Sequence, residues 1–394
     1  MAREVLIAIY LFVFRVTFNT FKIFPQKKKT VFIASFGDNI FHVLKEVEKQ
    51  TDEQVVILKS SQCRIDFNDD LHRTILNFET YNIIDWLQSI YHLATARHIF
   101  VDNYYGFLAV TNFKENVNVI QLWHAAGAIK RFGLKDPSIE NRSKLAHDRF
   151  KKVYQKFDYV VIGSEKMGNI FRESFDLHPN QLLRTGIPRT DFFFDQHTIE
   201  KTKENLLDKF SQLGNKKVMM YAPTYRDHAL KNQDLHLNIE QMYQELKDEY
   251  ILLLRLHPAV KFHPTYDYSD FVIDVSNYHN LSHLLTITDL LITDYSSIPF
   301  EFSLLNKPMI FYAYDLEAYA KQRGFWEDYE ELVPGPVVKT TDDLLKTIRH
   351  HNFNLNQVKE FAEQWNQYSR GYSSRQLVQS LYTETERQRE VAEL

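Results

Sequence analysis

Residues 290–301 have the sequence LLITDYSSIPFE, in which an apolar run leads directly into a helix start. An unbroken apolar run such as residues 290–293 is typical of a parallel strand that is buried on both faces. Ser296 and Ser297 are frequent N-cap residues and Pro299 suits the first helical turn, so a helix should follow the strand at once. The free backbone N–H groups of such a helix start can hold an anion. Capping without a ligand is the alternative, because many helices begin with this pattern.

Similar apolar runs recur on both sides of this segment, separated by helix-length stretches. Strands that alternate with helices form βαβ units, and these predict parallel sheets in an α/β protein. A polar, helix-like stretch at residues 198–213 divides the runs into two arrays, which predicts two successive doubly wound, Rossmann-like domains. The predicted strands are residues 31–34, 55–58, 98–101, 117–122, 159–162 and 182–185 in the first array and residues 218–221, 251–254, 271–273, 290–293, 309–312 and 337–338 in the second.

The composition excludes several classes of protein. A chain of 394 residues with 25% charged and 44% hydrophobic residues is not disordered, collagen-like or a multi-span membrane protein. The single cysteine, Cys63, excludes an internal disulfide and a cysteine-rich zinc site. A net charge of −4 provides no basic surface for nucleic acid. No GxGxxG, Walker A or HExxH motif is present, so we expect catalysis without a cofactor and without a protein-bound metal.

The two ends of the chain differ from its middle. Residues 5–14 are all apolar, and the following residues place three polar side chains on one face of a helix. Ten apolar residues are too short for a bilayer core of about 30 Å, so we predict an amphipathic helix over residues 1–24 on the cytoplasmic membrane face. The lysines at residues 27–29 would add attraction to anionic lipid. Packing of this helix against the protein's own core is the alternative.

These patterns set the expected domain limits. We predict an N-terminal domain over residues 25–205, a C-terminal domain over residues 206–375, and a charged, solvated helix over residues 376–394. Ligands of doubly wound sheets bind outside the carboxyl ends of the strands. The active site is therefore expected in a cleft between the two domains, and motifs at strand ends are its candidate residues.

Two histidines follow predicted strands. His124 leaves the strand at residues 117–122 in the sequence QLWHAAG and could take a proton from a hydroxyl nucleophile. A structural histidine packed beneath Trp123 is the alternative. His257 ends another strand in the sequence RLHP and could donate to a diphosphate oxygen or a leaving group, or serve only as a loop residue.

Three basic side chains lie in similar positions. Arg226 follows a strand in the sequence YAPTYR and could hold a phosphate through paired donors, or pair with Asp227. Lys130, just past the His124 loop, and Arg189, in the sequence GIPRTD, could supply positive charge to an acidic acceptor, although exposed basic residues are usually only solvated.

Five motifs occur here in the order found in the CDP-glycerol glycerophosphotransferase family of wall teichoic acid synthesis, which this chain resembles over residues 30–375. The resemblance implies a GT-B fold, with a donor CDP-glycerol and a lipid-linked acceptor at the cytoplasmic face of the membrane. It also implies that the domain over residues 25–205 faces the acceptor and the membrane and that the domain over residues 206–375 binds CDP-glycerol. The motifs are QLWH (residues 121–124), GIPRTD (186–191), YAPTYR (221–226), RLHP (255–258) and TDYSS (293–297).

The resemblance also implies roles for individual residues. His124 would be the general base on the acceptor hydroxyl and His257 a donor to the diphosphate, while glycerol phosphate is transferred and CMP is released. No metal ligands are implied. The implied donor-binding residues are Arg226, Asp294, Ser296, Ser297 and Glu301, and the implied acceptor-binding residues are Gly127, Lys130 and Arg189.

The implied acceptor depends on the branch of the family. Short members resemble the primase, which adds the first glycerol phosphate to the undecaprenyl-diphosphate-linked ManNAc-GlcNAc disaccharide. The loop at residues 124–127 is HAAG, whereas many polymerase-like members resemble His-Gly-Thr followed by Pro, so the primase is favoured. A second-step or polymerising glycerol- or ribitol-phosphate transferase, a GT-B enzyme of nucleotide sugars and a noncatalytic membrane scaffold are the alternatives. Other teichoic acid enzymes stay open as partners.

Overall fold

The computed structural model describes residues 2–68, 73–226, 235–257, 260 and 267–392. The chain forms two compact units. Unit 1 comprises the residues up to His124, residues 132–191 and the residues from Gln367 on, and unit 2 comprises residues 125–131 and 192–366. Each unit thus takes up a segment from the other half of the sequence. The domain limits expected from the sequence stay predictions.

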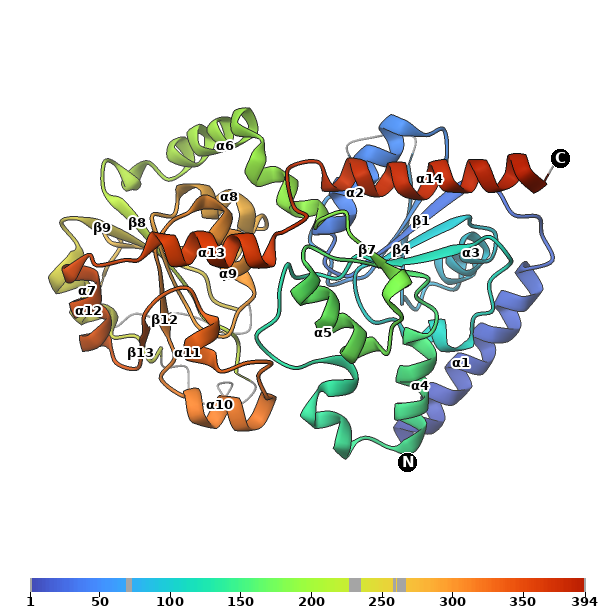
Figure 1. The fold of residues 1–394 in the computed structure, drawn as a ribbon, viewed down its shortest axis with the longest axis horizontal. Helices are drawn as coiled ribbons and strands as arrows, with labels where there is room; N and C mark the ends of the chain where they lie inside the picture. Colours follow the sequence, from blue (N-terminus) through green and yellow to red (C-terminus); the bar gives the residue numbers. More distant parts are fainter. Residues whose placement is uncertain (1, 69–72, 227–234, 258–259, 261–266, 393–394) are drawn as a thin grey trace. The chain divides into compact units, whose positions relative to one another are not determined.

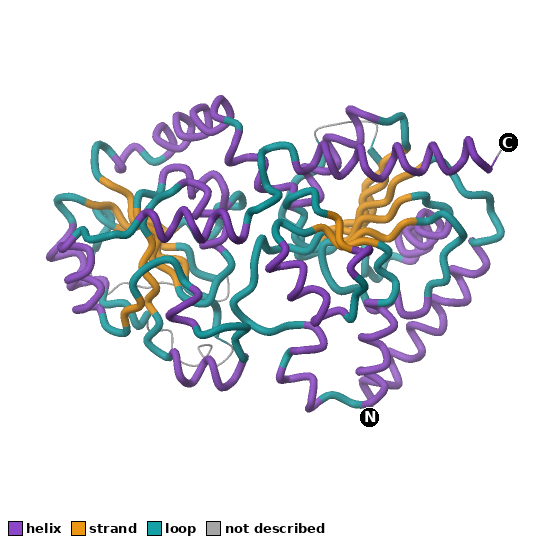
Figure 2. The backbone as a smooth tube through the Cα atoms, in the orientation of Figure 1, coloured by secondary structure: helices purple, strands orange, loops and turns teal. Residues whose placement is uncertain are grey.

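Unit 1 is built on a sheet whose seven described strands are all parallel, in the order β3-β2-β1-β4-β5-β6-β7 (Figures 1 and 2). The six strands predicted for this half are confirmed. Strand β3 was not predicted, because its short TILN sequence contains only one buried residue. The strands are β1 (Lys29–Ala34), β2 (Gln54–Lys59), β3 (Thr74–Asn77), β4 (His98–Val101), β5 (Asn118–Gln121), β6 (Tyr159–Val161) and β7 (Leu182–Leu183).

Helices cover both faces of this sheet in Figure 2, as expected for βαβ units. The C-terminal helix α14 packs against α2, and its residues Leu377, Val378 and Leu381 are buried. The prediction of a helix there is confirmed, but that of a solvated one is wrong for this first part, because its apolar side chains complete the core of unit 1. The helices are α1 (Ala2–Phe21), α2 (Asp38–Gln50), α3 (Ile83–Ala94), α4 (Lys144–Tyr154), α5 (Glu165–Phe175) and α14 (Ser373–Ala392).

Helix α1 has two different apolar faces. On one face Phe14 is fully buried and stacks on Phe107 at 4.9 Å between ring centroids. On the other face Leu6 and Phe12 remain 67% and 60% exposed. The helix therefore packs on its own unit, as the alternative held, and also presents an apolar surface. By length and composition alone, Arg3–Phe21 could cross a membrane, which is weak evidence for a span.

Unit 2 contains a second parallel sheet, with the order β10-β9-β8-β11-β12-β13 in the described residues. All six strands were predicted. Their side chains and those of the neighbouring helices form an apolar core. The strands are β8 (Lys217–Ala222), β9 (Tyr250–Leu254), β10 (Val272–Asp274), β11 (Leu290–Thr293), β12 (Met309–Tyr312) and β13 (Val337–Val338).

Helices again flank the sheet of unit 2 (Figure 2). Helices α6 and α8 pack together, as do α7 and α12. The helices are α6 (Gln196–Lys209), α7 (Ile239–Leu246), α8 (Leu281–Ile287), α9 (Ile298–Phe302), α10 (Leu316–Arg323), α11 (Tyr329–Leu332), α12 (Thr341–His350) and α13 (Leu355–Trp365).

Both sheets reverse their strand order at the first strand. In unit 1 the reversal lies between β1 and β4, and in unit 2 it lies between β8 and β11. The loops at the carboxyl ends of such neighbouring strands diverge to opposite faces of the sheet and leave room for a ligand. These two positions are therefore where a ligand of each sheet is expected to bind.

Candidate active site

His124 lies between two aromatic rings at the carboxyl edge of the unit 1 sheet. Its imidazole stacks on Phe36 at 4.1 Å and on Trp123 at 4.2 Å between ring centroids. Its Nδ1 atom lies 3.0 Å from the backbone carbonyl oxygen of Asp102. Because a carbonyl oxygen only accepts, Nδ1 carries a proton, and in the neutral imidazole the lone pair is then on Nε2. The packing beneath Trp123 and the geometry of a base are therefore both present.

Asp102 holds the loop that places Phe36 against His124. Its buried carboxylate accepts the backbone N–H groups of Ser35 at 2.9 Å, Phe36 at 2.9 Å and Gly37 at 2.7 Å. The hydroxyl of Tyr105 donates to the same carboxylate at 3.0 Å. Burial raises the pKa of Asp102 above its usual value, and these hydrogen bonds offset only part of the rise. One residue thus fixes the imidazole through its carbonyl and the stacking loop through its side chain.

Asn39 joins the His124 loop to the loop of Arg189. Its Nδ2 atom donates to the carbonyl oxygen of Trp123 at 2.9 Å, and its Oδ1 atom accepts the backbone N–H of Arg189 at 3.0 Å. Trp123 has a φ of 58°, a strained value for a non-glycine residue, so this bond helps to hold the turn before His124. Through Asn39, the structure therefore links the backbone just before His124 to that of Arg189 in unit 1.

The segment that follows His124 belongs to unit 2. Gly127 lies against Phe300 so closely that a Cβ atom would be 2.3 Å from the ring. The backbone N–H of Arg131 donates to the carbonyl oxygen of Gly324 at 3.0 Å, and Lys130 pairs with Phe325 in an antiparallel bridge. Gly127 and Lys130 are consequently in a different unit from Arg189, with which the sequence had grouped them.

Lys130 lies among charged residues of unit 2. Burial lowers the pKa of Lys130 to about 8, with further lowering by Arg323 and Arg226 and an opposing effect of Asp294. Among the described residues, the Lys130 ammonium group has no hydrogen bond or ion pair. It is a half-buried cation beside the residues predicted to bind the donor.

Arg226 and Asp294 form a buried ion pair at the corresponding position in unit 2. The Nη2 atom of Arg226 lies 3.0 Å from Asp294 Oδ2, and its Nε atom lies 2.8 Å from Asp315 Oδ2. The guanidinium also lies over the rings of Tyr295 at 4.9 Å and Tyr319 at 4.5 Å. The structure thus brings two predicted donor-binding residues together. Asp227, the alternative partner of Arg226, lies outside the described residues.

Helix α9 starts where the sequence predicted it. Ser296 caps it, since its Oγ atom accepts the N–H of Ile298 at 3.3 Å, whereas the side chain of Ser297 makes no cap bond. The helix has only five residues, so its dipole is small. Glu301 within it is 2% exposed. The serines are therefore at a helix start, but a strong anion site is not required by the helix alone.

His257 is exposed at the end of β9, and its ring lies 4.3 Å from that of Tyr225. Pro258 of the same motif lies outside the described residues. In the described part of the chain, no group of three His, Cys, Asp or Glu residues is placed to hold a metal ion.

Comparison with known proteins assigns the family. The model of CDP-glycerol:poly(glycerophosphate) glycerophosphotransferase matches residues 16–383. The chain belongs to this family. It is 38% identical to the teichoic acid glycerol-phosphate primase of Bacillus subtilis (strain 168), over 90% of this chain and 91% of that protein. It is 34% identical to a teichoic acid poly(ribitol-phosphate) polymerase of Bacillus spizizenii, over 93% of this chain but 58% of that protein.

Solved structures resemble the fold of this glycerophosphotransferase. The wall teichoic acid polymerase TagF superposes with a TM-score of 0.81 at 23% identity, over 98% of both chains. A UDP-GlcNAc 2-epimerase from Neisseria meningitidis superposes with a TM-score of 0.58 at 16% identity, over 91% of this chain and 100% of that one. The prediction of a GT-B fold with two parallel sheets is confirmed, and the family places the enzyme in wall teichoic acid synthesis.

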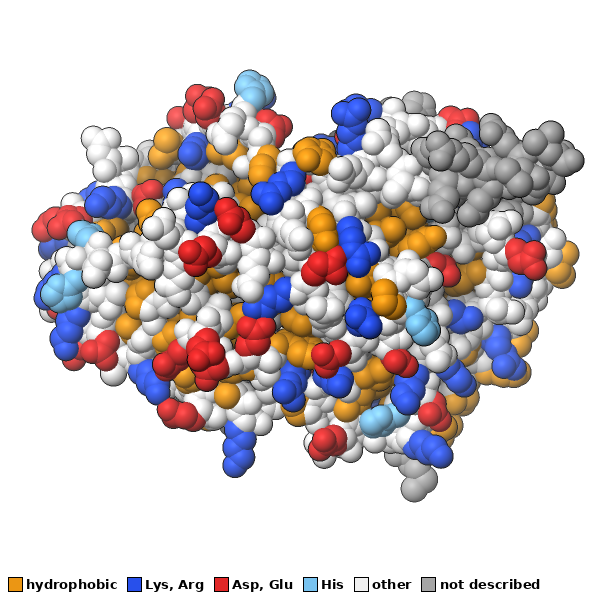
Figure 3. All heavy atoms as spheres, in the orientation of Figure 1, with side chains coloured by type: hydrophobic (Ala, Val, Ile, Leu, Met, Phe, Trp, Pro, Cys, Tyr) orange, Lys and Arg blue, Asp and Glu red, His pale blue; other side chains and the backbone are white. Residues whose placement is uncertain are grey.

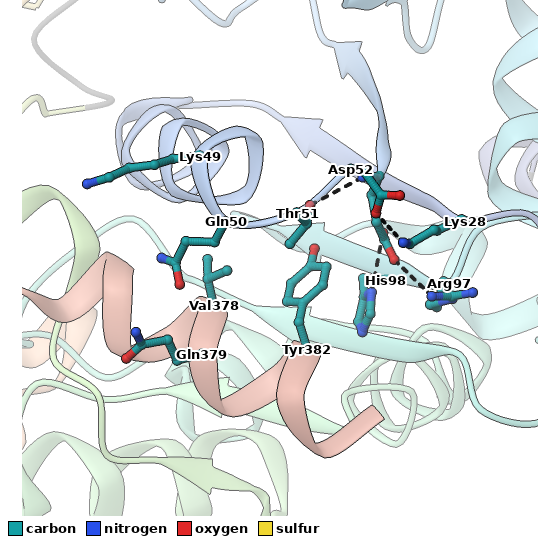
Figure 4. Close-up of a pocket in the computed structure, with 11 residues that line it drawn as sticks. Lys28, Lys49, Gln50, Thr51, Asp52, Arg97, His98, Val378, Gln379 and Tyr382 are labelled. Atoms are coloured by element: carbon teal, nitrogen blue, oxygen red, sulfur yellow. Dashed lines mark hydrogen bonds and ion pairs between the residues drawn. The ribbon is translucent and has the colours of Figure 1, made fainter. Parts of the chain in front are cut away.

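The glycerophosphotransferase also has a polar pocket of about 360 Å³ at the amino ends of its unit 1 strands (Figure 4). Glu53, just before β2, accepts from Thr30 Oγ1 at 2.5 Å and pairs with Arg97 at 3.3 Å. Figure 4 shows Tyr382 of α14 beside His98, with 4.2 Å between ring centroids. Because His124 lies at the carboxyl edge, this pocket is at the opposite edge of the sheet. Residues of α14 form part of its wall, and none of the predicted site residues lines it.

Sequence reasoning missed Phe36, Asn39 and Asp102. Asp102 directly follows β4, just as Asp294 of the TDYSS motif directly follows β11, so its position at a strand end was an available signal. Phe36 and Asn39 follow β1 but carry no recognisable motif.

Proposed function

We propose that this glycerophosphotransferase is a primase, which transfers one glycerol phosphate from CDP-glycerol to the undecaprenyl-diphosphate-linked ManNAc-GlcNAc disaccharide. The higher identity to the Bacillus subtilis primase, 38% against 34% for the polymerase relative, supports this. The HAAG loop at residues 124–127 is a second argument, since many polymerase-like members resemble His-Gly-Thr there.

His124 is the proposed general base. The observation that carries this role is the 3.0 Å contact of Nδ1 with the Asp102 carbonyl, which leaves the lone pair on Nε2. Nε2 takes the proton of the acceptor hydroxyl while the hydroxyl oxygen attacks the phosphorus that bears glycerol. The bond from this phosphorus to the bridging oxygen of the diphosphate breaks, and CMP leaves with that oxygen. A general base of this kind contributes about 10²–10⁴ in rate.

The proposed donor site is built from unit 2. Ser296, Ser297 and His257 would meet the phosphates, and Glu301 the ribose, while the buried pair of Arg226 and Asp294 keeps the surrounding loops in place. Lys130 was assigned to the acceptor on sequence grounds. We now assign it to the donor, because its segment pairs with residues of unit 2 and its neighbours are Arg226, Asp294 and Arg323.

The proposed acceptor site retains Arg189 and the His124 loop, whose tight packing at Gly127 fixes its path. Membrane attachment is proposed for the outer face of α1, where Leu6, Ile9 and Phe12 are more than half exposed. Replacing Phe12 by Glu should weaken co-sedimentation with anionic vesicles while the protein stays folded. Unchanged co-sedimentation would assign attachment to another surface.

Product analysis tests the function. The enzyme, CDP-glycerol and a lipid-linked disaccharide should yield one added glycerol phosphate and CMP. The His124→Ala variant should lose about 10²–10⁴ of this rate yet bind CDP-glycerol normally. A long polymer would indicate a polymerase, and turnover with CDP-ribitol would indicate a ribitol-phosphate transferase. Absence of transfer to every lipid-linked acceptor would refute the proposal.

A further inference from the structure

Unit 1 contains a groove of about 490 Å³ outside the site described above. It lies between α1, α4 and the short helix η1 (Gly106–Val110). Its walls include Tyr10 and Leu11 of α1, Phe107 of η1 and Phe150 of α4. No residue of the proposed transfer site lines it. The walls are thus suited to a hydrocarbon chain.

Three arginines, Arg3, Arg142 and Arg149, line the same groove and outnumber its two glutamates. Arg149 pairs with Glu4 at 3.2 Å and so ties α4 to α1. Within the described ranges, the guanidinium groups of Arg3 and Arg142 make no hydrogen bond or ion pair, and both residues are exposed. A groove with apolar walls and two such cations suits a molecule that has both an anionic group and a hydrocarbon chain.

The surroundings of the groove are apolar as well. Leu6 on α1 and Leu145 on α4 are each 67% exposed. Figure 3 shows hydrophobic side chains together with Lys and Arg along the edge over which α1 runs. A ligand in the groove would therefore lie next to a surface that suits the boundary of a membrane.

The groove is also connected to the general base through the chain. Helix η1 begins four residues after Asp102, whose carbonyl oxygen contacts His124. Between them, Tyr105 donates its hydroxyl to the Asp102 carboxylate. A ligand held against Phe107 thus lies on the continuation of the loop that orients the catalytic imidazole.

We propose that this groove binds the diphosphate-bearing prenyl end of the lipid-linked acceptor, an inference that rests on the proposed function. Arg142 and Arg3 neutralise the diphosphate, and Tyr10, Leu11, Phe107 and Phe150 cover the adjoining prenyl units. A soluble phosphate would not need these apolar walls, and a plain hydrocarbon would not need the arginines. An anionic phospholipid is the competing occupant that the experiment must separate.

Kinetics of Arg142→Ala test the assignment. The KM for the undecaprenyl-diphosphate-linked disaccharide should rise about tenfold, because a charge-assisted contact to the diphosphate is lost. The KM for CDP-glycerol and the KM for a soluble disaccharide without diphosphate or prenyl chain should not change. Lys144→Ala, an exposed neighbour that does not line the groove, is the matched control. An equal rise for both acceptors, or none, would overturn the proposal.

Cross-linking gives a second test that needs no turnover. The wild-type enzyme, in uncharged detergent micelles, is irradiated with a photoreactive prenyl diphosphate. Labelling of peptides from α1, η1 or α4, undiminished by excess phosphatidylglycerol, is the expected result. Labelling elsewhere, or its loss with phosphatidylglycerol, would overturn the proposal. Labelling of the groove by an enzyme that transfers nothing would instead refute the proposed function alone.

Discussion

The two sheets use the same residue type at the same topological position, but with different partners. Asp102 directly follows β4 and Asp294 directly follows β11, next to the first strand of each sheet. Each carboxylate accepts a backbone N–H from the loop after that first strand, Ser35 in unit 1 and Thr224 in unit 2. The carboxylate of Asp102 accepts hydrogen bonds from neutral groups, whereas Asp294 also pairs with Arg226.

This difference matches the chemistry proposed for each unit. The Asp102 frame is fixed by three backbone N–H groups and a tyrosine hydroxyl, and it holds an imidazole by a neutral carbonyl. The Asp294 frame carries a cation and lies near Lys130 and Arg323. The same topology therefore supports two different sites. In unit 1 neutral hydrogen bonds hold the proposed base in place, and in unit 2 cations surround the proposed diphosphate site.

Removing the guanidinium group of Arg226 in unit 2 should produce the largest effect. Arg226→Met removes the cation that pairs with the carboxylates of Asp294 and Asp315, and the side chain of Asp294 is only 1% exposed. Breaking a buried pair in this way should lower the free energy of unfolding by about 3–5 kcal/mol. Urea unfolding followed by fluorescence measures the change.

The matched control is Arg184→Met in unit 1. Arg184 pairs with Glu165 at 2.5 Å, but both side chains are nearly half exposed. Solvent screens such a pair, so less than about 1 kcal/mol should be lost. Equal losses for the two variants would show that the ion pair of Arg226 has no special weight in unit 2.

Weakening the hydrogen bonds of the Asp102 carboxylate should lower kcat and leave donor binding unchanged. In Asp102→Asn, the amide nitrogen meets backbone N–H donors, so about two hydrogen bonds worth about 1 kcal/mol each are lost. The Phe36 loop then holds His124 less firmly, and kcat should fall about 10- to 100-fold. Steady-state kinetics should show an unchanged KM for CDP-glycerol.

Asp158→Asn controls for a general loss of stability. Asp158 also accepts a backbone N–H, that of Val119 at 2.7 Å, but at the amino end of the same sheet. This variant should unfold more easily and keep its kcat. If it loses as much kcat as Asp102→Asn, Asp102 has no positioning role beyond stabilising unit 1.

The fold was predictable because parallel strands buried on both faces form continuous apolar runs. Only β3 escaped, since Thr74 and Ile75 are half exposed and its four residues resemble a loop. His124 and Arg226 were found because each follows a strand, and Asp294 because it lies in the TDYSS motif. Their partners were harder to find, because the bonds of Asp102 to the loop after β1 join residues 65 to 67 positions apart.

The path of the chain after His124 was not predictable either. The seven residues from Ala125 to Arg131 belong to unit 2, although the sequence places them between two strands of unit 1. They are held by the packing of Gly127 on Phe300 and by backbone hydrogen bonds to residues 324–326, which are almost two hundred positions away in the sequence. A local pattern carries no information about such contacts, so Lys130 was assigned to the acceptor.

Lys130→Met tests this reassignment and should produce the smallest of the three effects. Loss of one charge-assisted contact to the diphosphate should raise the KM for CDP-glycerol about tenfold, with the acceptor KM unchanged. Arg131→Met, which removes the neighbouring cation of the same segment, should leave both constants near the wild-type values. A rise in the acceptor KM instead would return Lys130 to the acceptor site.

The pH dependence adds a signature that a packing role would not have. Lys130 has a pKa of about 8, because burial and Arg323 disfavour its charged form, so the free enzyme loses this cation as the pH rises through 8. Only the ammonium form attracts a diphosphate, and kcat/KM for CDP-glycerol should therefore fall between about pH 7 and pH 9. Lys130→Arg keeps its charge over this range and should abolish the fall, as should Lys130→Met from a lower starting value. A fall that persists in both variants would show that another group titrates, and that the lysine does not bind the donor.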